Sequence, residues 1–162
     1  MSAVPQPMPS LGTQLVRYSY AYKEQVLELA RQMHEESAAH SGMALDRRKL
    51  AERLGAAAES STAYVMLAVR DGTVLGGFLG TITGTFFSDE LAAKDLAWFV
   101  SKERRGSVAA VTLVRDFERW ARAMGAKRIF LGQSTGVDIE KTRALYEHLG
   151  YRTVGFNAVK EC

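Results

Sequence analysis

The stretch that decides the fold is Val100-Ser-Lys-Glu-Arg-Arg-Gly-Ser-Val-Ala-Ala110. It joins the end of an apolar strand to a short basic turn, and a long amphipathic helical pattern follows. A helix start presents free backbone N–H groups and about half a positive charge, and a glycine lets an anion approach the backbone closely. Arg104 and Arg105 would add direct charge neutralisation. The stretch therefore predicts an anion-binding site, with helix capping by Ser107 as the simpler alternative.

Two other phosphate-binding patterns do not fit this turn. It is too short for a G-x-x-x-x-G-K-[ST] loop and lacks its lysine, and the chain has no G-x-G-x-x-G. Nucleoside triphosphate and dinucleotide folds are therefore disfavoured. The chain has 21 basic and 18 acidic residues, a net charge of +3. Its densest basic cluster is Lys102, Arg104 and Arg105, which suits one polyphosphate better than a nucleic-acid duplex.

Hydrophobic periodicity on both sides of this stretch predicts one domain of alternating strands and helices. The expected order is strand, helix, helix, three strands, helix, strand, helix, strand. This order predicts a mixed α/β sheet whose antiparallel first half leads into two crossover helices. The strands are expected at 14–20, 63–69, 74–83, 91–101, 127–132 and 151–160, and the helices at 23–39, 45–59, 107–124 and 139–149.

Local signals support several of these elements. Asp71-Gly72 lies between two runs rich in β-branched residues and predicts a two-residue hairpin turn. Glycines 76, 77, 80 and 84 weaken the second of these strands and indicate a bulge or a close backbone contact. Residues 128–131 are strongly apolar, which is typical of a buried parallel or central strand. Gly125 is expected to end the long helix.

A second motif, Leu145-Tyr146-Glu147-His148-Leu149-Gly150-Tyr151, ends the last predicted helix. Together with Val100-x-x-x-x-Arg105-Gly106, and with the long helix and short apolar strand between them, it resembles the GCN5-related N-acetyltransferases. The resemblance covers about residues 95–156, and the element order is consistent across the domain. It implies an α/β fold with a mixed, mostly antiparallel sheet of six to seven strands and about four helices.

The resemblance also implies acetyl-CoA as co-substrate. The backbone of Phe99 and Val100 would pair with the pantetheine arm like an added strand. The family's R/Q-x-x-G-x-G/A loop aligns with residues 105–110, where Val108 replaces the usual glycine; a second departure is Ile139, where many members have asparagine. The cofactor-binding residues implied in this way are Phe99, Val100, Arg104, Arg105, Gly106, Ser107, Val108, Ala109 and Ala110.

By the same resemblance, an acetyl group would pass directly from the thioester to a primary amine. The reaction needs an unprotonated amine, an oriented thioester, a donor for the oxyanion and an acid for the thiolate. The Val100 N–H is the candidate oxyanion donor, and Tyr146 is the candidate acid. Asp95 is the candidate base, with Glu90 or a water chain as alternatives. For Tyr146, packing in the core is the competing interpretation.

The acceptor cannot be named from the sequence. His34, Glu35 and Glu36 end the first helix, where the family's acceptor-binding loop begins, and these side chains would attract a cationic amine; a solvated helix end is the ordinary alternative. The acceptor is expected to be a small molecule or a protein amine. A non-catalytic acyl-CoA-binding or regulatory module on the same fold is the competing function, because fold does not determine function.

Length and composition bound the remaining possibilities. The chain of 162 residues has its three prolines at positions 5, 7 and 9, so residues 1–11 are expected to form a flexible leader and 12–162 the acetyltransferase domain. No apolar run is long enough to span a bilayer, so no membrane partner is expected. The only cysteine is Cys162, which excludes a disulfide within the chain, and no metal site is expected. These features predict a cytoplasmic protein, and an open edge at 151–160 predicts a weak tendency to form homodimers.

Overall fold

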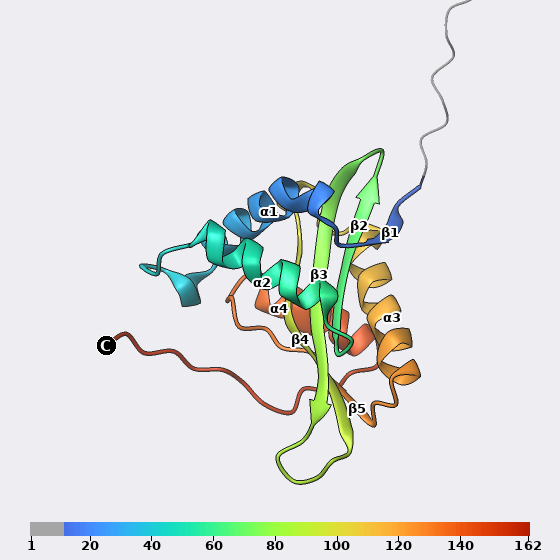
Figure 1. The fold of residues 1–162 in the computed structure, drawn as a ribbon. Helices are drawn as coiled ribbons and strands as arrows, with labels where there is room; N and C mark the ends of the chain where they lie inside the picture. Colours follow the sequence, from blue (N-terminus) through green and yellow to red (C-terminus); the bar gives the residue numbers. More distant parts are fainter. Residues whose placement is uncertain (1–11) are drawn as a thin grey trace, which may run out of the picture.

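A five-stranded sheet organises residues 12–162, the part of the chain that the computed structural model describes (Figure 1). The strands follow one another in the sheet in sequence order, and the first four are antiparallel. The fifth is parallel to the fourth. The α/β class and the mixed, mostly antiparallel sheet are thus confirmed. The strands are β1 (Gln14–Arg17), β2 (Ala63–Arg70), β3 (Thr73–Gly84), β4 (Leu91–Val100) and β5 (Arg128–Phe130).

Helices cover both faces of this sheet. The helices are α1 (Lys23–Glu36), α2 (Arg47–Glu59), α3 (Val108–Ala123) and α4 (Ile139–His148), with short 3₁₀ turns η1 (Tyr20–Tyr22), η2 (Ala38–His40) and η3 (Lys102–Arg104). Side chains alternate across a strand, so β2 contributes to two cores. Tyr64 and Ala68 pack with α3, whereas Val65, Leu67 and Val69 pack with α1 and α2. The two helical layers therefore lie on opposite faces of the sheet. In the described residues, no helix is long and apolar enough to cross a membrane.

The long helix α3 forms where the sequence predicts it, for local reasons. Ser107 is its N-cap, and the serine hydroxyl accepts a hydrogen bond from the Ala109 N–H at 3.4 Å. Leu113, Val114 and Phe117 lie on one face and are fully buried. Gly125 then adopts a left-handed φ of 86°, which ends the helix as expected. This helix packs its apolar face on β2, β3 and β4 and so holds its N-terminus beside the end of β4.

The glycines of the central hairpin behave as predicted. Asp71 and Gly72 both have positive φ, 49° and 76°, as a two-residue turn between twisted strands requires. At Gly80, an added Cβ would lie 2.4 Å from a ring carbon of Phe117. At Gly76, it would lie 2.7 Å from the Phe99 carbonyl oxygen. Both glycines therefore allow close packing that no side chain permits.

A bulge and an early end to pairing separate β4 from β5. Leu79 and Gly80 of β3 are paired with Ala97 and Asp95, so Leu96 is the extra residue on β4. β5 pairs only with residues 92–94 of β4. β4 then continues to Val100, while the chain after β5 becomes a loop that leads to α4. Among residues 12–162, the second half of β4 thus has no strand neighbour on the β5 side.

The final predicted strand, 151–160, is wrong, and residues 12–162 form five strands where six to seven were expected. This segment forms no strand and runs away from the sheet to the C-terminus (Figure 1). Its Val154 and Phe156 are exposed. An alternating apolar pattern forms a strand only when a neighbour supplies hydrogen-bond partners, and the short β5 is no such template here. β5 is parallel to β4, as one of the two predicted alternatives had it, but it lies at the edge of the described sheet and Phe130 is 48% exposed, so the predicted burial is wrong.

Three smaller boundaries also differ from the sequence prediction. The first strand ends at Arg17 rather than at residue 20, and the first helix ends at Glu36, before the turn η2. The second helix begins at Arg47, after Asp46, whose side chain accepts a hydrogen bond from the Lys49 N–H at 2.9 Å. The predicted leader, residues 1–11, lies outside the described residues.

Candidate active site

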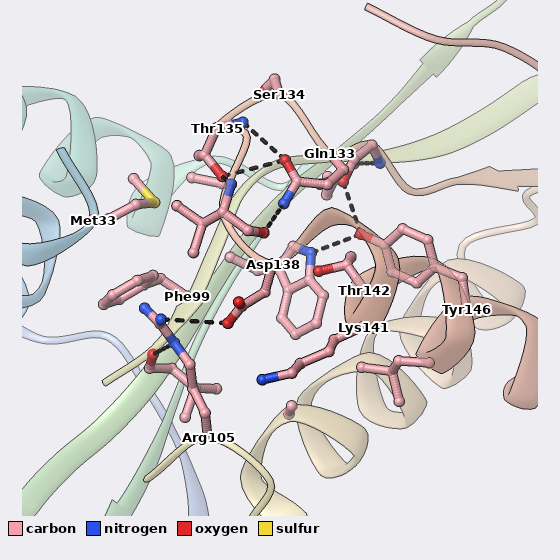
Figure 2. Close-up of a pocket in the computed structure, with 18 of the residues that line it drawn as sticks. Met33, Phe99, Arg105, Gln133, Ser134, Thr135, Asp138, Lys141, Thr142 and Tyr146 are labelled. Carbon is pink, nitrogen blue, oxygen red and sulfur yellow. Dashed lines mark hydrogen bonds and ion pairs between the residues drawn. The ribbon is translucent and has the colours of Figure 1, made fainter. Parts of the chain in front are cut away.

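A cavity of about 560 Å³ opens where β4 and β5 separate (Figure 2). Its walls are the second half of β4, the start of α3, the loop 132–138 and one face of α4. Met33 of α1 and His40 of η2 close it from the other layer of the fold. The cavity thus lies where the predicted cofactor-binding turn, the predicted catalytic residues and the predicted acceptor-side helix meet.

The turn before α3 forms one end of this cavity. Gly106 has a left-handed φ of 81°, and no atom lies within 4 Å of the Cβ it lacks. Gly106, Ser107 and Ala110 line the cavity. The first N–H groups of a helix have no backbone partner within it, so this end combines an open turn with backbone donors. Two of these are already in use: the Ala109 N–H donates to the Ser107 hydroxyl and the Ser107 N–H to Arg104 O. Val108, at the position where the resembled family has glycine, is 63% exposed.

The free edge of β4 leads from this turn toward the centre of the cavity. The Ser101 N–H donates to Leu75 O on β3 at 2.9 Å, so the backbone N–H of Ser101 faces β3. Successive strand residues direct their peptide groups to opposite edges, and the N–H and C=O of Val100 therefore face the cavity. Arg105 Nε indeed donates to Val100 O from that side, at 3.4 Å. An extended ligand could hydrogen-bond to this edge as an additional strand.

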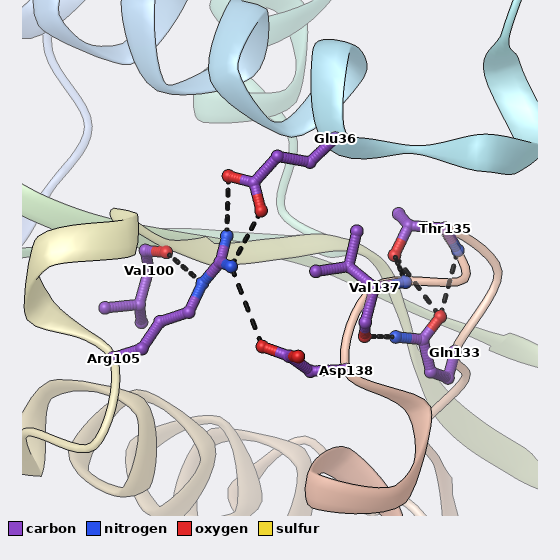
Figure 3. Close-up of polar contacts among 7 residues, drawn as sticks. All are labelled: Glu36, Val100, Arg105, Gln133, Thr135, Val137 and Asp138. Carbon is purple, nitrogen blue, oxygen red and sulfur yellow. Dashed lines mark hydrogen bonds and ion pairs between the residues drawn. The ribbon is translucent and has the colours of Figure 1, made fainter.

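The Arg105 side chain occupies a position that the sequence does not predict (Figure 3). Its guanidinium binds Glu36 at the end of α1 through two contacts, of 2.9 Å and 2.7 Å. Asp138, before α4, lies 3.7 Å from the same guanidinium. The arginine also lies over the ring of Phe99, 5.1 Å from its centre. Arg105 thus connects the acceptor-side helix to the loop before α4, and two carboxylates already balance its charge.

Two predicted catalytic residues, Asp95 of β4 and Tyr146 of α4, both hydrogen-bond to the backbone of Gly132. The Gly132 N–H donates to Asp95 Oδ1 at 2.8 Å, and Tyr146 Oη donates to Gly132 O at 2.7 Å. Trp98 Nε1 donates to Tyr146 Oη at 3.1 Å. The bulge in β4 and the early end of β5 bring these groups together, because both features occur at this level of the sheet. All four residues line the cavity.

Burial changes the acid–base character of both side chains. It raises the pKa of Asp95 above its ordinary 3.8, although the hydrogen bond from Gly132 opposes this change. Burial also raises the pKa of Tyr146 above that of an ordinary phenol, and the negative charge of Asp95 acts in the same direction. Asp95 is therefore a better proton acceptor than an exposed aspartate. Tyr146 remains a neutral hydrogen-bond donor at physiological pH.

Other predicted residues lie outside this group. Glu90 is exposed in the β3–β4 loop and does not line the cavity. Three residues at the end of α1 were predicted to attract the acceptor. Glu36 joins the site through Arg105, whereas His34 and Glu35 do not line the cavity. Arg104 is exposed in η3. In residues 12–162, no three His, Cys, Asp or Glu side chains are placed to share a metal ion.

Sequence reasoning missed the loop 132–138 entirely. Gln133 organises it: its Oε1 accepts from the N–H groups of Thr135 and Gly136, each at 3.0 Å. Its Nε2 donates to Val137 O (Figure 3). The segment has no hydrophobic period, and a single glutamine carries no local signal for this role. Trp98 and His40 were missed for the same reason, since only the folded chain brings them to the cavity.

A sequence model of the acetyltransferase (GNAT) family matches residues 23–151. The chain belongs to this family. Its members are acetyl-CoA-dependent transferases, so the resemblance found in the basic turn and the Leu-Tyr-Glu-His-Leu-Gly-Tyr motif is confirmed. The GNAT match spans the cavity, from α1 to the end of α4. Among curated proteins, none matches this chain significantly.

Solved structures agree with the GNAT fold. A Bacillus halodurans protein is 17% identical, with a TM-score of 0.78 over 92% of this chain and 99% of that one. An acetyltransferase of Trypanosoma brucei is 18% identical, with a TM-score of 0.71 over 93% and 100%. The aminoglycoside N-acetyltransferase AAC(6')-Iy, solved with CoA, is 14% identical, with a TM-score of 0.72 over 98% and 99%. At identities of 14–18%, the similarity to these structures shows the fold of this GNAT chain alone.

Proposed function

We propose that this GNAT chain moves an acetyl group from acetyl-CoA to a primary amine by direct attack. The observation that carries the proposal is the free edge of β4, which runs from the Asp95–Tyr146 group to the open turn at the start of α3. An extended pantetheine arm suits that edge, and a pyrophosphate suits the backbone donors of 105–110. The thioester would then lie beside the Val100 N–H and the hydroxyl of Tyr146.

The proposed cofactor contacts rely mainly on backbone groups. Val100 would pair with the pantetheine arm through its N–H and C=O, whereas the predicted backbone pairing of Phe99 does not fit, because the Phe99 carbonyl oxygen faces Gly76 on β3. The amides from Arg105 to Ala110 would bind the pyrophosphate, with Arg104 adding exposed positive charge. The Arg105 guanidinium contacts two carboxylates, those of Glu36 and Asp138. A pyrophosphate next to it would compete with Glu36 for the guanidinium, because Arg forms strong bidentate contacts with either anion.

The transfer requires the amine to lose two protons in total. A protonated amine loses the first before it attacks, and the nitrogen loses the second as the tetrahedral intermediate collapses. The Val100 N–H would stabilise the oxyanion. Asp95, whose pKa burial raises, would accept a proton directly or through water. Tyr146 would turn its hydroxyl from Gly132 O to the departing thiolate and stabilise or protonate it.

One observation favours the competing function, a non-catalytic acyl-CoA-binding module. The Tyr146 hydroxyl already donates to a backbone carbonyl, and its raised pKa makes complete proton transfer to a thiolate unfavourable. A binding module and an enzyme would both bind acetyl-CoA. Only the enzyme would release free CoA thiol when an amine is added.

The test has a binding part and a turnover part. Acetyl-CoA at saturation should raise the melting temperature, whereas NAD and ATP at equal concentration should not, because a ligand of the native state stabilises it. Acetyl-CoA should then release thiol in the presence of one or more amines from a panel of an aminoglycoside, spermidine, tyramine and a peptide with a free N-terminus. Stabilisation without thiol release from any amine would support the binding module. No stabilisation would contradict both functions.

A further inference from the structure

A serine–histidine pair lies on the acceptor side of the cavity, in the segment after α1. Ser37 Oγ lies 2.6 Å from His40 Nδ1 and 3.2 Å from Thr135 O. Ser37 is 3% exposed, so water does not compete for these contacts. His40 lines the cavity with Asp95 and Tyr146. The short turn η2 therefore holds an imidazole against the loop 132–138, facing the proposed reaction centre from the other layer.

Counting protons determines which ring nitrogen of His40 carries hydrogen. A serine hydroxyl has one proton to donate, and a carbonyl oxygen only accepts. Ser37 therefore gives its proton to Thr135 O, and its oxygen accepts from Nδ1–H of His40. The neutral ring then has no hydrogen on Nε2, and a lone pair remains there. This tautomer follows from the positions of two heavy atoms around one buried hydroxyl.

Nε2 of His40 is available to a ligand. Across residues 12–162, it has no hydrogen-bond partner, and it is not buried. The neighbouring His34 differs: its ring centre is 6.3 Å from that of His40, but its Nε2 is buried without a partner in the same residues and does not reach the cavity. Of the two histidines near the end of α1, only His40 lines the cavity, and Nε2 is its ring nitrogen without a partner in the described residues.

We propose that His40 accepts the first proton from the acceptor ammonium, with Ser37 as its positioning residue. The inference rests on the proposed acetyl transfer. The R–NH₃⁺ group gives one proton to Nε2, and the ring becomes a cation held by Ser37. The free amine attacks the thioester carbon, the new N–C bond forms and the C–S bond breaks. The second nitrogen proton leaves to Asp95 or to the thiolate, and His40 returns its proton to solvent.

The tautomer can be measured without knowing the acceptor. Nitrogen-15 NMR of the imidazoles at a pH where the ring is neutral should show hydrogen on Nδ1 and an unprotonated Nε2 for His40. Ser37→Ala should remove this preference, because the acceptor of the Nδ1–H bond is lost. Exposed His148, at the end of α4, serves as the internal reference. Hydrogen on Nε2 of His40 in the wild-type protein would overturn the proposal.

The proton transfer is tested with the amine that gives the fastest thiol release in the panel. His40→Asn keeps an N–H donor for Ser37 but has no basic nitrogen, so kcat should fall about 10²–10⁴-fold. The KM for acetyl-CoA and the melting temperature should change little. His148→Asn is the matched control and should keep wild-type kcat. Added imidazole should restore part of the turnover of His40→Ala, which a structural role would not allow.

The outcomes separate this inference from the function on which it rests. Normal turnover of His40→Asn, or no rescue of His40→Ala by imidazole, would overturn the role of His40 and leave acetyl transfer intact. Absence of thiol release by the wild-type protein with every amine would contradict the transferase function itself, and the role of His40 with it. Loss of turnover in His40→Asn with rescue of His40→Ala would support both.

Discussion

Replacing Tyr146 with phenylalanine removes one oxygen atom from the centre of the candidate active site. That oxygen donates to Gly132 O at 2.7 Å and accepts from Trp98 Nε1 at 3.1 Å. The phenylalanine ring can keep its packing beside Trp98, whose ring centre is 6.2 Å away. The substitution therefore separates what the hydroxyl does from what the ring does.

The cost in stability comes from the part-buried Trp98 Nε1–H, which loses its acceptor, whereas the exposed Gly132 O can bind water instead. An unsatisfied buried polar group costs about 1–3 kcal/mol. In a domain of 150–250 residues, each kcal/mol lowers the melting temperature by about 2–4 °C. We therefore expect the melting temperature of Tyr146→Phe to fall by about 2–12 °C. The affinity for acetyl-CoA should change little, because the ring remains in place.

The effect on turnover decides the role of Tyr146. If the hydroxyl stabilises or protonates the thiolate, kcat should fall about 10²–10⁴-fold. The assay measures thiol release from acetyl-CoA with a panel amine, beside melting temperature and acetyl-CoA affinity on the same preparation. A near-normal kcat would refute the assignment, and water or another group would then supply the proton.

Tyr64→Phe provides the matched control. The Tyr64 hydroxyl donates to Asp116 Oδ2 at 2.6 Å, on the α3 face of the sheet and outside the cavity. A hydrogen bond to a charged group contributes about 1.5–3 kcal/mol, so the control should lose comparable stability. Its kcat, measured well below the melting temperature, should stay at the wild-type value. An equal loss of kcat in both variants would mean that turnover only follows stability.

Three further predictions concern other parts of the site and core. Arg105→Glu should weaken acetyl-CoA binding far more than Arg115→Glu, as calorimetry can measure, because Arg105 lines the cavity and Arg115 lies half-exposed on α3; equal effects would mean that only net charge matters. Asp95→Asn should lower kcat without loss of stability at pH 7. Burial raises the pKa of Asp95, so the wild-type protein loses stability as the pH rises through the folded pKa and this carboxyl ionises. The variant avoids that loss, and its advantage in stability should vanish below pH 3.8, the ordinary pKa of an aspartate; a variant less stable than the wild type at pH 7 would contradict this. Gly80→Val should unfold the chain at a much lower temperature, because the ring of Phe117 already lies 2.4 Å from an added Cβ; an unchanged melting temperature would disprove this tight contact.

Much of the fold was predictable because its causes are local. Hydrophobic period places four helices and five strands within a few residues of their observed bounds. Ser107 caps α3 and Gly125 ends it, through contacts with the adjacent turn of the same helix. Asp71-Gly72 forms its turn because few residues tolerate two successive left-handed conformations. Each of these signals needs only neighbours along the chain.

The failures have the opposite cause. Residues 151–160 have an alternating apolar pattern, but a strand also needs an adjacent strand with free hydrogen-bonding groups. The run at 128–131 was expected to be a buried parallel or central strand because it is apolar. It is parallel, yet its exposure depends on which strands pair with it, and it lies at the edge of the described sheet. Composition describes a segment, whereas pairing depends on residues far away in the sequence.

The candidate site divides in the same way. The sequence alone determined the family, the basic turn before α3 and the presence of Asp95 and Tyr146, because these are motifs of neighbouring residues. Only the tertiary structure decided that Arg105 binds Glu36, that Asp95 and Tyr146 hold one peptide segment at Gly132, and that Ser37 directs His40 into the cavity. The partners lie 14 to 98 positions apart along the chain, except Ser37 and His40, which belong to one turn. Hydrogen bonds and ion pairs act over a few ångströms of space, so such partners are set by the packing of the layers and leave no pattern along the chain.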